Sequence, residues 1–443
     1  MTLILNVWLE EAATPIGHLV KGDDSSLAFA YAPDWLSQPE RHALSLSLPL
    51  SDEPFGDAPV RAFFDNLLQE NNLLQQIIAR EGIDRSDIAE LLAHMGADCA
   101  GAVSVLRPDH PPIKRPGNIQ QDYDAIDDAA FAELVERLAT GRPLPGEMRD
   151  PSPVAGVRPK ISLTALPDGR FALPKPGSGA PTTHILKLPD PDHPHEARDE
   201  AFLTLIAEKC GFSVGYSAAD AVGGHDVLLI ARFDRRIDDD LIYRLHQEDF
   251  AQAAGLPAEL KYERRGTPQR RFDAKMIGHI LAATDQPALA RETFLRMTLF
   301  NLLVGNNDNH AKNNALLHGP GQSTRLAPFY DLVPVQMVGG FREDLAFRLG
   351  NAAMPDELTH PDLIQFCTDI GLPERGAAKR LSSAAHDLIE SLEQLSVDFP
   401  PEMRALDRLF GETAQRMIET VGLDIKLRER DAHVVKGGGW ALS

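Results

Sequence analysis

The sequence predicts an α+β protein with a two-lobed unit, first strand-rich and then mostly helical, behind a separate N-terminal α+β domain. The hydrophobic pattern mixes strands and helices in residues 1–107, favours strands in 151–245 and favours helices in 246–430. A proline-rich stretch, 108–150, separates the first segment from the second. A length of 443 residues agrees with two or three domains of ordinary size.

The N-terminal domain is predicted from short local patterns. Residues 1–9 are apolar, lack a basic leader and precede two glutamates, which is typical of a first strand rather than a signal peptide. Apolar residues recur at helical spacing over 60–68. A second helix is expected over 87–95, and a strand over 100–105.

The rest of the chain divides into a linker, two lobes and a tail. Residues 108–150 are typical of a linker with one short helix over 127–140. The strand-rich lobe has expected strands near residue 160, at 184–188 and at 227–233, with a helix over 199–210. Helices are expected over 247–254, 273–283, 290–304, 360–370, 374–395 and 401–421. Residues 431–443 contain three consecutive glycines and are expected to form a loose tail.

Composition narrows the class of protein. Hydrophobic residues make up 43% and charged residues 25%, as in ordinary soluble proteins, and no apolar run is long enough for a membrane span. A net charge of −21 argues against nucleic-acid binding through a broad field of the chain's own, but is compatible with a basic partner. Cys99, Cys210 and Cys367 are far apart, which argues against a disulfide framework or a cysteine-rich zinc site and fits a reducing cytoplasm.

A dense polar cluster carries the most information about chemistry. It spans 306–314 and follows Gly305, a suitable C-cap for the apolar helix expected over 290–304. Within it, Asp308 and Asn313 are five residues apart. Phosphotransfer loops use an aspartate to orient and deprotonate the acceptor hydroxyl, and an asparagine five positions later to bind Mg²⁺. We therefore predict Asp308 as catalytic base and Asn313 as a metal ligand.

A second metal ligand is predicted at Asp331, just beyond an expected strand and eighteen residues after Asn313. Mg²⁺ takes few protein carboxylates and completes its shell with water and phosphate, so one aspartate and one asparagine suffice. His310 and Lys312, in the same loop, are candidate nucleotide contacts. For His310, a metal site shared with His318 and a structural hydrogen-bonding role are the alternatives.

The predicted phosphate contacts lie in the strand-rich lobe. Lys187 is the lysine of an apolar strand and would be costly to bury without an anionic partner, for which Glu200 is the candidate. The alternatives are a lysine that extends its ammonium to water from a strand edge and a glutamate that stabilises a helix start. The expected phosphate loop has one glycine and matches no standard glycine-rich motif. Its backbone amides and basic side chains remain suited to phosphate. The loop candidates are Val154, Ala155, Gly156, Val157, Arg158 and Lys160.

These elements, in this order, resemble the HipA family of bacterial toxin kinases, which act in HipA–HipB toxin–antitoxin systems. The resemblance spans nearly the whole chain. The motifs that carry it lie at residues 44–50, 63–68, 96–102, 184–187, 232–235, 247–252, 261–263, 307–313 and 326–331.

The resemblance implies a two-lobed kinase fold of HipA type, with the catalytic roles given above for Asp308, Asn313, Asp331 and Lys187. It implies ATP and Mg²⁺ as cofactors and phosphorylation of serine or threonine on a protein of translation, such as an aminoacyl-tRNA synthetase. It also implies a HipB-like DNA-binding antitoxin as partner, with operator DNA bound through that complex. The adenine hinge would be the three residues Ala231, Arg232 and Phe233, with Ala231 where the family usually has glutamate.

Family members can autophosphorylate a serine just before the loop glycine. Pro153 aligns with that serine in this chain, which leaves Ser152 as the candidate.

Two other functions stay open at this stage. A cluster of Arg375, Lys379 and Arg380 on one expected helix would suit a binding module that holds an antitoxin on DNA. Phosphorylation of a small molecule would use the same catalytic residues.

Overall fold

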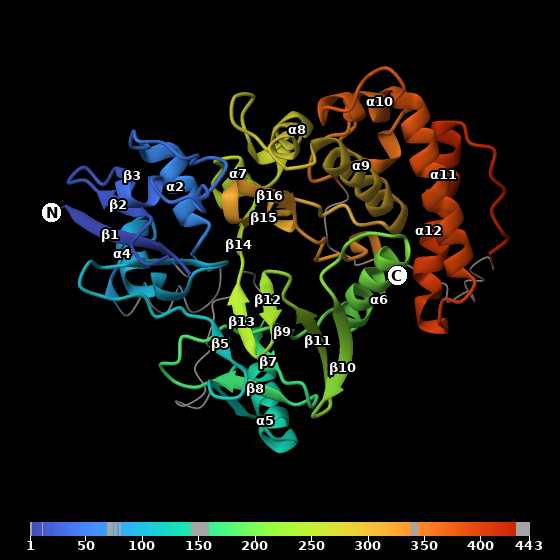
Figure 1. The fold of residues 1–443 in the computed structure, drawn as a ribbon. Coiled ribbons are helices and arrows are strands. Elements are labelled where there is room, and N and C mark those ends of the chain that lie inside the picture. Colours follow the sequence, from blue (N-terminus) through green and yellow to red (C-terminus); the bar gives the residue numbers. More distant parts are fainter. Residues whose placement is uncertain are drawn as a thin grey trace, which may run out of the picture.

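A computed structural model describes residues 2–10, 12–68, 74, 78, 81–142, 159–337 and 344–430 of the chain. It contains an N-terminal sheet domain, a strand-rich lobe and a helical lobe, so the predicted α+β class is confirmed (Figure 1). No helix in the described part of the chain is long and apolar enough to cross a bilayer.

The N-terminal domain is built on a four-stranded antiparallel sheet with the order β3-β2-β1-β4. Its strands are β1 (Leu3–Leu9), β2 (Gly17–Lys21), β3 (Leu27–Tyr31) and β4 (Val103–Leu106), and its helices are α1 (Pro33–Leu36), α2 (Asp57–Asp65) and α4 (Ile88–Met95). Alternate residues of β1 and β3 point into the core, where Phe29 packs on Phe64 of α2. The strand expected over 100–105 starts only at Val103, because Gly101 has the left-handed backbone of a turn.

The strand-rich lobe contains a six-stranded sheet with the order β10-β11-β9-β7-β8-β6. The strands of this lobe are β5 (Gly117–Asn118), β6 (Tyr123–Ala125), β7 (Lys160–Ala165), β8 (Phe171–Pro174), β9 (His184–Lys187), β10 (Ser217–Val222), β11 (His225–Ala231), β12 (Arg235–Asp238) and β13 (Leu241–Arg244). Helices α5 (Asp128–Ala139) and α6 (Glu196–Lys209) pack on this lobe. Residues 117–139, which we expected to be part of a linker, thus add strands and a helix to the lobe (Figure 1).

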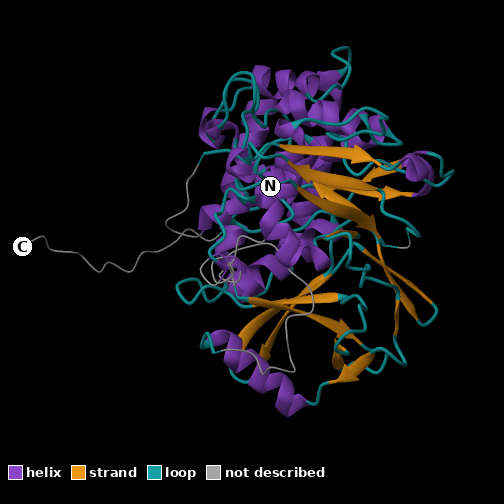
Figure 2. Cartoon of the chain, turned by 90° about the vertical axis from the view of Figure 1, so that its left-hand side faces the viewer, coloured by secondary structure: helices purple, strands orange, loops and turns teal. Residues whose placement is uncertain are grey.

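The helical lobe surrounds α9 (Pro287–Val304), whose Phe294, Leu295 and Phe300 are fully buried. The other helices are α7 (Phe250–Ala253), α8 (Ala274–Ala282), α10 (His360–Asp369), α11 (Ala377–Ser396) and α12 (Arg404–Val421), and a small sheet is formed by β14 (His246–Asp249), β15 (Ala315–Gly319) and β16 (Ser323–Leu326). The helix expected over 247–254 is shorter than predicted, since β14 pairs with β15 and only residues 250–253 are helical. Figure 2 shows most of the helices gathered at one end of the molecule, whereas the other end consists mainly of strands with a helix packed on them.

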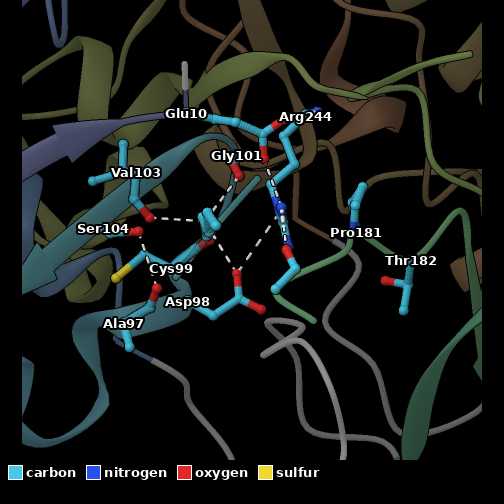
Figure 3. A network of polar contacts seen from close by, with 12 residues as sticks. Glu10, Ala97, Asp98, Cys99, Gly101, Val103, Ser104, Pro181, Thr182 and Arg244 are labelled. Atoms are coloured by element: carbon cyan, nitrogen blue, oxygen red, sulfur yellow. Dashed lines mark hydrogen bonds and ion pairs between the residues drawn. The ribbon is translucent and has the colours of Figure 1, made fainter. Parts of the chain in front are cut away.

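A buried charge network joins the N-terminal domain to the strand-rich lobe (Figure 3). Lys114 donates to the carbonyls of Cys99, Gly101 and Val103 and forms an ion pair with Asp98 at 3.0 Å. Burial lowers the pKa of Lys114 to about 8, against the opposing pull of Asp98. Arg244 of β13 pairs with Glu10 at 2.6 Å. The connection between the domains is therefore fixed by paired charges that are largely shielded from water.

Candidate active site

One cavity of about 490 Å³ collects the predicted site residues that the structure describes. Its walls come from the strand-rich lobe, the helical lobe and, through Asn66 and Ala100, the N-terminal domain. The predicted residues in its lining are Lys160, Lys187, Glu200, Ala231, Arg232, Phe233, Asp308, His310, Lys312, Asn313 and Asp331. The remaining candidates, Ser152, Val154, Ala155, Gly156, Val157 and Arg158, lie outside the described residues.

The polar cluster leaves α9 through a sharp turn. Gly305 has φ 72°, as predicted for a glycine cap, and a Cβ there would lie 2.6 Å from Leu409 Cδ2. The backbone N–H of Asn306 returns to Asn301 O at 2.8 Å. The side chain of Asn313 closes the loop by donating from Nδ2 to Asp308 O at 2.9 Å. This internal hydrogen bond explains why the five-residue spacing matters, since it brings the two ends of the motif together.

The carboxylate of Asp308 is held by Tyr262, whose hydroxyl donates to Asp308 Oδ1 at 2.7 Å. Burial raises the pKa of Asp308, and the hydrogen bond from Tyr262 partly opposes this effect. Tyr262 was not among the predicted site residues, although it lies in the 261–263 motif of the HipA resemblance. A carboxylate with a raised pKa that stays within reach of a cavity suits a general base.

Asn313 and Asp331 offer the oxygen ligands that Mg²⁺ requires. Because Nδ2 of Asn313 is already bonded to Asp308 O, its Oδ1 is the atom left for a cation. Asp331 has φ 57°, a left-handed conformation that Asp adopts more readily than most residues. The described residues contain no group of three His, Cys, Asp or Glu that could hold a metal. One carboxylate and one amide fit a cation that takes its other ligands from phosphate and water.

Lys187 lies between two carboxylates in the cavity. Its Nζ is 2.7 Å from Glu200 Oε2 and 3.5 Å from Asp331 Oδ1. Burial opposes the charge on Lys187, but the two carboxylates outweigh burial and raise its pKa, so the ammonium stays charged. In the β7–β9 pair, Lys160 stands directly opposite Lys187. Two cations placed opposite each other across paired strands repel, which destabilises the pair. A bound anion between them would offset this repulsion.

His310 faces the cavity as a neutral imidazole. Burial, with the positive charge of Lys261, lowers its pKa to about 3. Its Nδ1 and the hydroxyl of Ser217, which also lines the cavity, are buried and have no hydrogen-bond partner in the described part of the protein. Such atoms are expected where a ligand supplies the partner. The alternative metal site with His318 does not form, because His318 Nε2 bonds to Glu248 Oε1 at 2.8 Å.

The N-terminal domain reaches the polar loop 306–314 through Asn66. Lys312 Nζ donates to Asn66 Oδ1 at 2.8 Å and to Asp249 Oδ2 at 2.9 Å. The amide nitrogen of Asn66 donates to Leu256 O at 3.0 Å, so the residue bridges α2, the chain after α7 and the loop. This contact was not predicted from the sequence, because Asn66 and Lys312 are 246 residues apart.

The predicted hinge follows the end of β11. Two of its backbone N–H groups are already used, since Ala231 N donates to Tyr216 O and Arg232 N donates to Thr183 O. The Arg232 side chain pairs with Asp234 at 2.9 Å. The ring of Phe233 stacks on Tyr330 at 5.3 Å, and both rings line the cavity. The hinge thus presents an aromatic wall to the cavity.

Two family models match the chain: the HipA N-terminal domain over residues 5–106 and the HipA-like C-terminal domain over residues 152–392. The second of these covers more than half of the chain. The chain belongs to the HipA family. The HipA resemblance seen in the sequence motifs is thereby confirmed.

Several known proteins are similar to this chain over most of their length. Y4mE of Sinorhizobium fredii, which is named as a candidate kinase, is 30% identical over 398 residues, 89% of this chain and 92% of that protein. The serine/threonine-protein kinase toxin HipA of Shewanella oneidensis is 28% identical over 395 residues, 85% and 86% of the two chains. A chain in the solved complex of S. oneidensis HipA, HipB and operator DNA matches with a TM-score of 0.75 at 25% identity. The match covers 94% of this chain and 97% of that chain. The kinase class and fold predicted from the sequence are confirmed.

Proposed function

We propose that the protein transfers the γ-phosphoryl group of ATP to a serine or threonine hydroxyl of another protein, with Mg²⁺ bound to Asn313 and Asp331. The proposal rests on the set of charged and polar side chains that line one cavity. Cations from two paired strands, Lys160 and Lys187, and the oxygens of Asp308, Asn313 and Asp331 line the same space. Phosphoryl transfer needs little more from a protein than this positioning and charge.

Several of the residues that line the cavity have separate roles in phosphoryl transfer. Asp308 accepts a hydrogen bond from the acceptor hydroxyl and takes its proton as the oxygen bonds to the γ-phosphorus. The bond from that phosphorus to the β,γ-bridging oxygen breaks, and ADP leaves with the electron pair. Lys187, charged and oriented by Glu200, binds the phosphates, while Lys160 and Lys312 provide further positive charge. Bound Mg²⁺ would neutralise the charge of the polyphosphate.

The test uses the purified protein, labelled ATP and a cell lysate. The wild-type protein is expected to label discrete protein bands, and Asp308→Asn, which keeps the side-chain shape, is expected to label none. Equal labelling by Asp308→Asn would contradict the role of Asp308. Label that appears only in low-molecular-weight products would instead support a small-molecule kinase.

We further propose that the kinase acts as the toxin of a toxin–antitoxin module in the cytoplasm. The support is the similarity to a chain from the solved complex of S. oneidensis HipA, HipB and operator DNA. A HipB-like antitoxin, operator binding through it and an acceptor in translation such as an aminoacyl-tRNA synthetase belong to this proposal. Expression of the wild type is expected to arrest growth, and Asp308→Asn is expected not to. A comparison of phosphorylated proteins in the two cultures would identify the acceptor.

A role in holding an antitoxin on DNA is the second candidate. Arg380 pairs with Glu292 at 2.9 Å, whereas Arg375 and Lys379 are exposed just before and at the start of α11. Charge reversal of these two exposed residues should weaken operator binding of the antitoxin complex and leave phosphorylation intact. Unchanged operator affinity would contradict a role of Arg375 and Lys379 in holding the antitoxin on DNA.

The predicted phosphate loop, the hinge contacts to adenine and autophosphorylation at Ser152 remain parts of the proposal. Mass spectrometry of the protein after incubation with ATP checks the last point. A phosphate on Ser152 supports it, and a phosphate only elsewhere contradicts it.

A further inference from the structure

A second pocket of about 220 Å³ lies beside the Tyr262–Asp308 pair and has no part in the reaction described above. Its lining includes Glu263 and Arg264 of the short 3₁₀ helix Glu263–Arg265, together with Asp344, Leu345, Phe347 and Arg348. Glu263 N donates to Ala346 O at 2.9 Å, and Ala346 N donates to Asn307 O at 3.2 Å. The pocket is therefore tied by backbone hydrogen bonds to the residue that precedes Asp308.

Arginines dominate the pocket's charge. Arg264, Arg271 and Arg348 line it together with two acids, Glu263 and Asp344. Both acids are already engaged, since Asp344 is 3.2 Å from Arg264 and Glu263 is 3.7 Å from Arg271. The guanidinium of Arg348 donates to a backbone carbonyl, Asn351 O, and no carboxylate of the described residues lies within ion-pair distance of it. Arg271 also pairs with Asp273 at 2.9 Å, so the uncompensated positive charge of the pocket lining is that of Arg348.

Two more cations surround Tyr262, between the pocket and the catalytic base. Lys261 Nζ lies 5.6 Å and Arg265 Cζ lies 5.3 Å from the centre of the Tyr262 ring. Neither has a carboxylate within ion-pair distance among the residues that the structure describes. Arg265 and Arg348 are solvent-exposed, and Lys261 also lines the main cavity with Asp308. The chain as a whole has a net charge of −21, so this cluster of positive side chains is opposite in sign to the protein's net charge.

We propose that the pocket and its flanking cations bind an acidic side chain of the acceptor protein, next to the hydroxyl that is phosphorylated. The inference rests on the proposed kinase function and names the recognition chemistry of that site. Arginine forks match carboxylates in geometry as well as in charge. The negative charge of the rest of the chain would repel an acidic acceptor from other surfaces, so the cationic pocket also favours correct orientation.

The experiment uses two fluorescent peptides that contain one serine, flanked by glutamates in the first and by lysines in the second. Binding is followed by anisotropy, and phosphorylation is followed with labelled ATP. The wild type should bind and phosphorylate the glutamate peptide at least tenfold better. The double variant Arg265→Glu, Arg348→Glu should weaken its binding at least tenfold and raise the peptide KM, without changing the KM for ATP.

A charge-matched control separates the pocket from a general charge effect. Lys209→Glu, Arg404→Glu changes two exposed basic residues on α6 and α12 by the same total charge and should leave peptide binding unchanged. The neutral pair Arg265→Gln, Arg348→Gln should fall between wild type and the double reversal. Melting temperatures of all variants identify any loss that comes from folding.

Three results would overturn the proposal. The first is a wild type that prefers the lysine peptide or treats both peptides alike, and the second is an equal loss in the pocket variant and the control. Tighter binding of a single-stranded oligonucleotide that depends on the pocket would also replace the acidic acceptor by nucleic acid. Because anisotropy needs no catalysis, pocket-dependent peptide binding without any labelling of a lysate would contradict the kinase function alone.

Discussion

The contact between Asn66 and Lys312 predicts that a substitution in the N-terminal domain slows the reaction in a cavity formed mainly by the two lobes. Asn66→Ala removes the acceptor of the 2.8 Å hydrogen bond from Lys312 and the donors to Ala62 O and Leu256 O. Lys312 keeps its bond to Asp249 and therefore becomes less well oriented, but is not released.

The magnitude follows from the kind of bond. A hydrogen bond to a charged group contributes about 1.5–3 kcal/mol to stability. If about 1.4 kcal/mol of this is lost from the transition state, kcat falls about tenfold. The KM for ATP should change less, because Lys187 with Glu200 and Lys160 still bind the phosphates in this scheme. Steady-state kinetics at saturating ATP measures both quantities.

Ser45→Ala provides the matched control. Ser45 lies on the same domain interface and donates to Glu248 Oε2 at 2.5 Å, but neither residue lines the active-site cavity. Both variants should lower the melting temperature by similar amounts, and only Asn66→Ala should lower kcat. If the two variants show the same kcat, the hydrogen bonds of Asn66 only stabilise the interface. The claim that Asn66 orients Lys312 for the reaction is then refuted.

Three further predictions concern single residues. Glu200→Gln should raise the KM for ATP about tenfold, because Lys187 then turns toward Asp331; an unchanged KM would mean that Glu200 does not orient the lysine. Tyr262→Phe removes the hydrogen bond that lowers the pKa of Asp308, so that pKa rises further and the acidic limb of the kcat–pH profile moves to higher pH; a fixed limb would contradict Asp308 as the titrating base. Lys114→Met should lower the free energy of unfolding by about 3–5 kcal/mol in urea, since Asp98 loses its partner, whereas the exposed Lys209→Met should change it by about 0.5 kcal/mol at most.

The polar loop 306–314 and the helix before it could be predicted from the sequence because the residues that determine them are close together in the chain. Gly305 ends α9 at the expected residue, and the spacing of Asp308 and Asn313 is enforced by a hydrogen bond within the loop itself. Lys187 and Glu200 are thirteen residues apart on a strand and the next helix, so their pairing also follows from neighbouring elements.

The contacts that could not be predicted from the sequence join segments that are far apart along the chain. Tyr262 reaches Asp308 across 46 residues and Asn66 reaches Lys312 across 246, and no periodic pattern encodes such pairs. The same limit applies to secondary structure. Residues 246–249 are strand and not helix because β15, far along the chain, supplies their hydrogen-bond partners. Strands β5 and β6 likewise join the lobe through partners in β13 and β8.

The buried network around Lys114 bears on how the chain unfolds. Its members belong to both family segments and to the stretch between them: Asp98 and Glu10 on one side, Lys114 in the middle and Arg244 on the other. Separating the segments would leave each half with charges that have lost their counter-ions, so partial unfolding at this junction is costly. The N-terminal domain and the adjoining lobe should therefore melt in one cooperative transition, and neither should behave as an independent module when expressed alone.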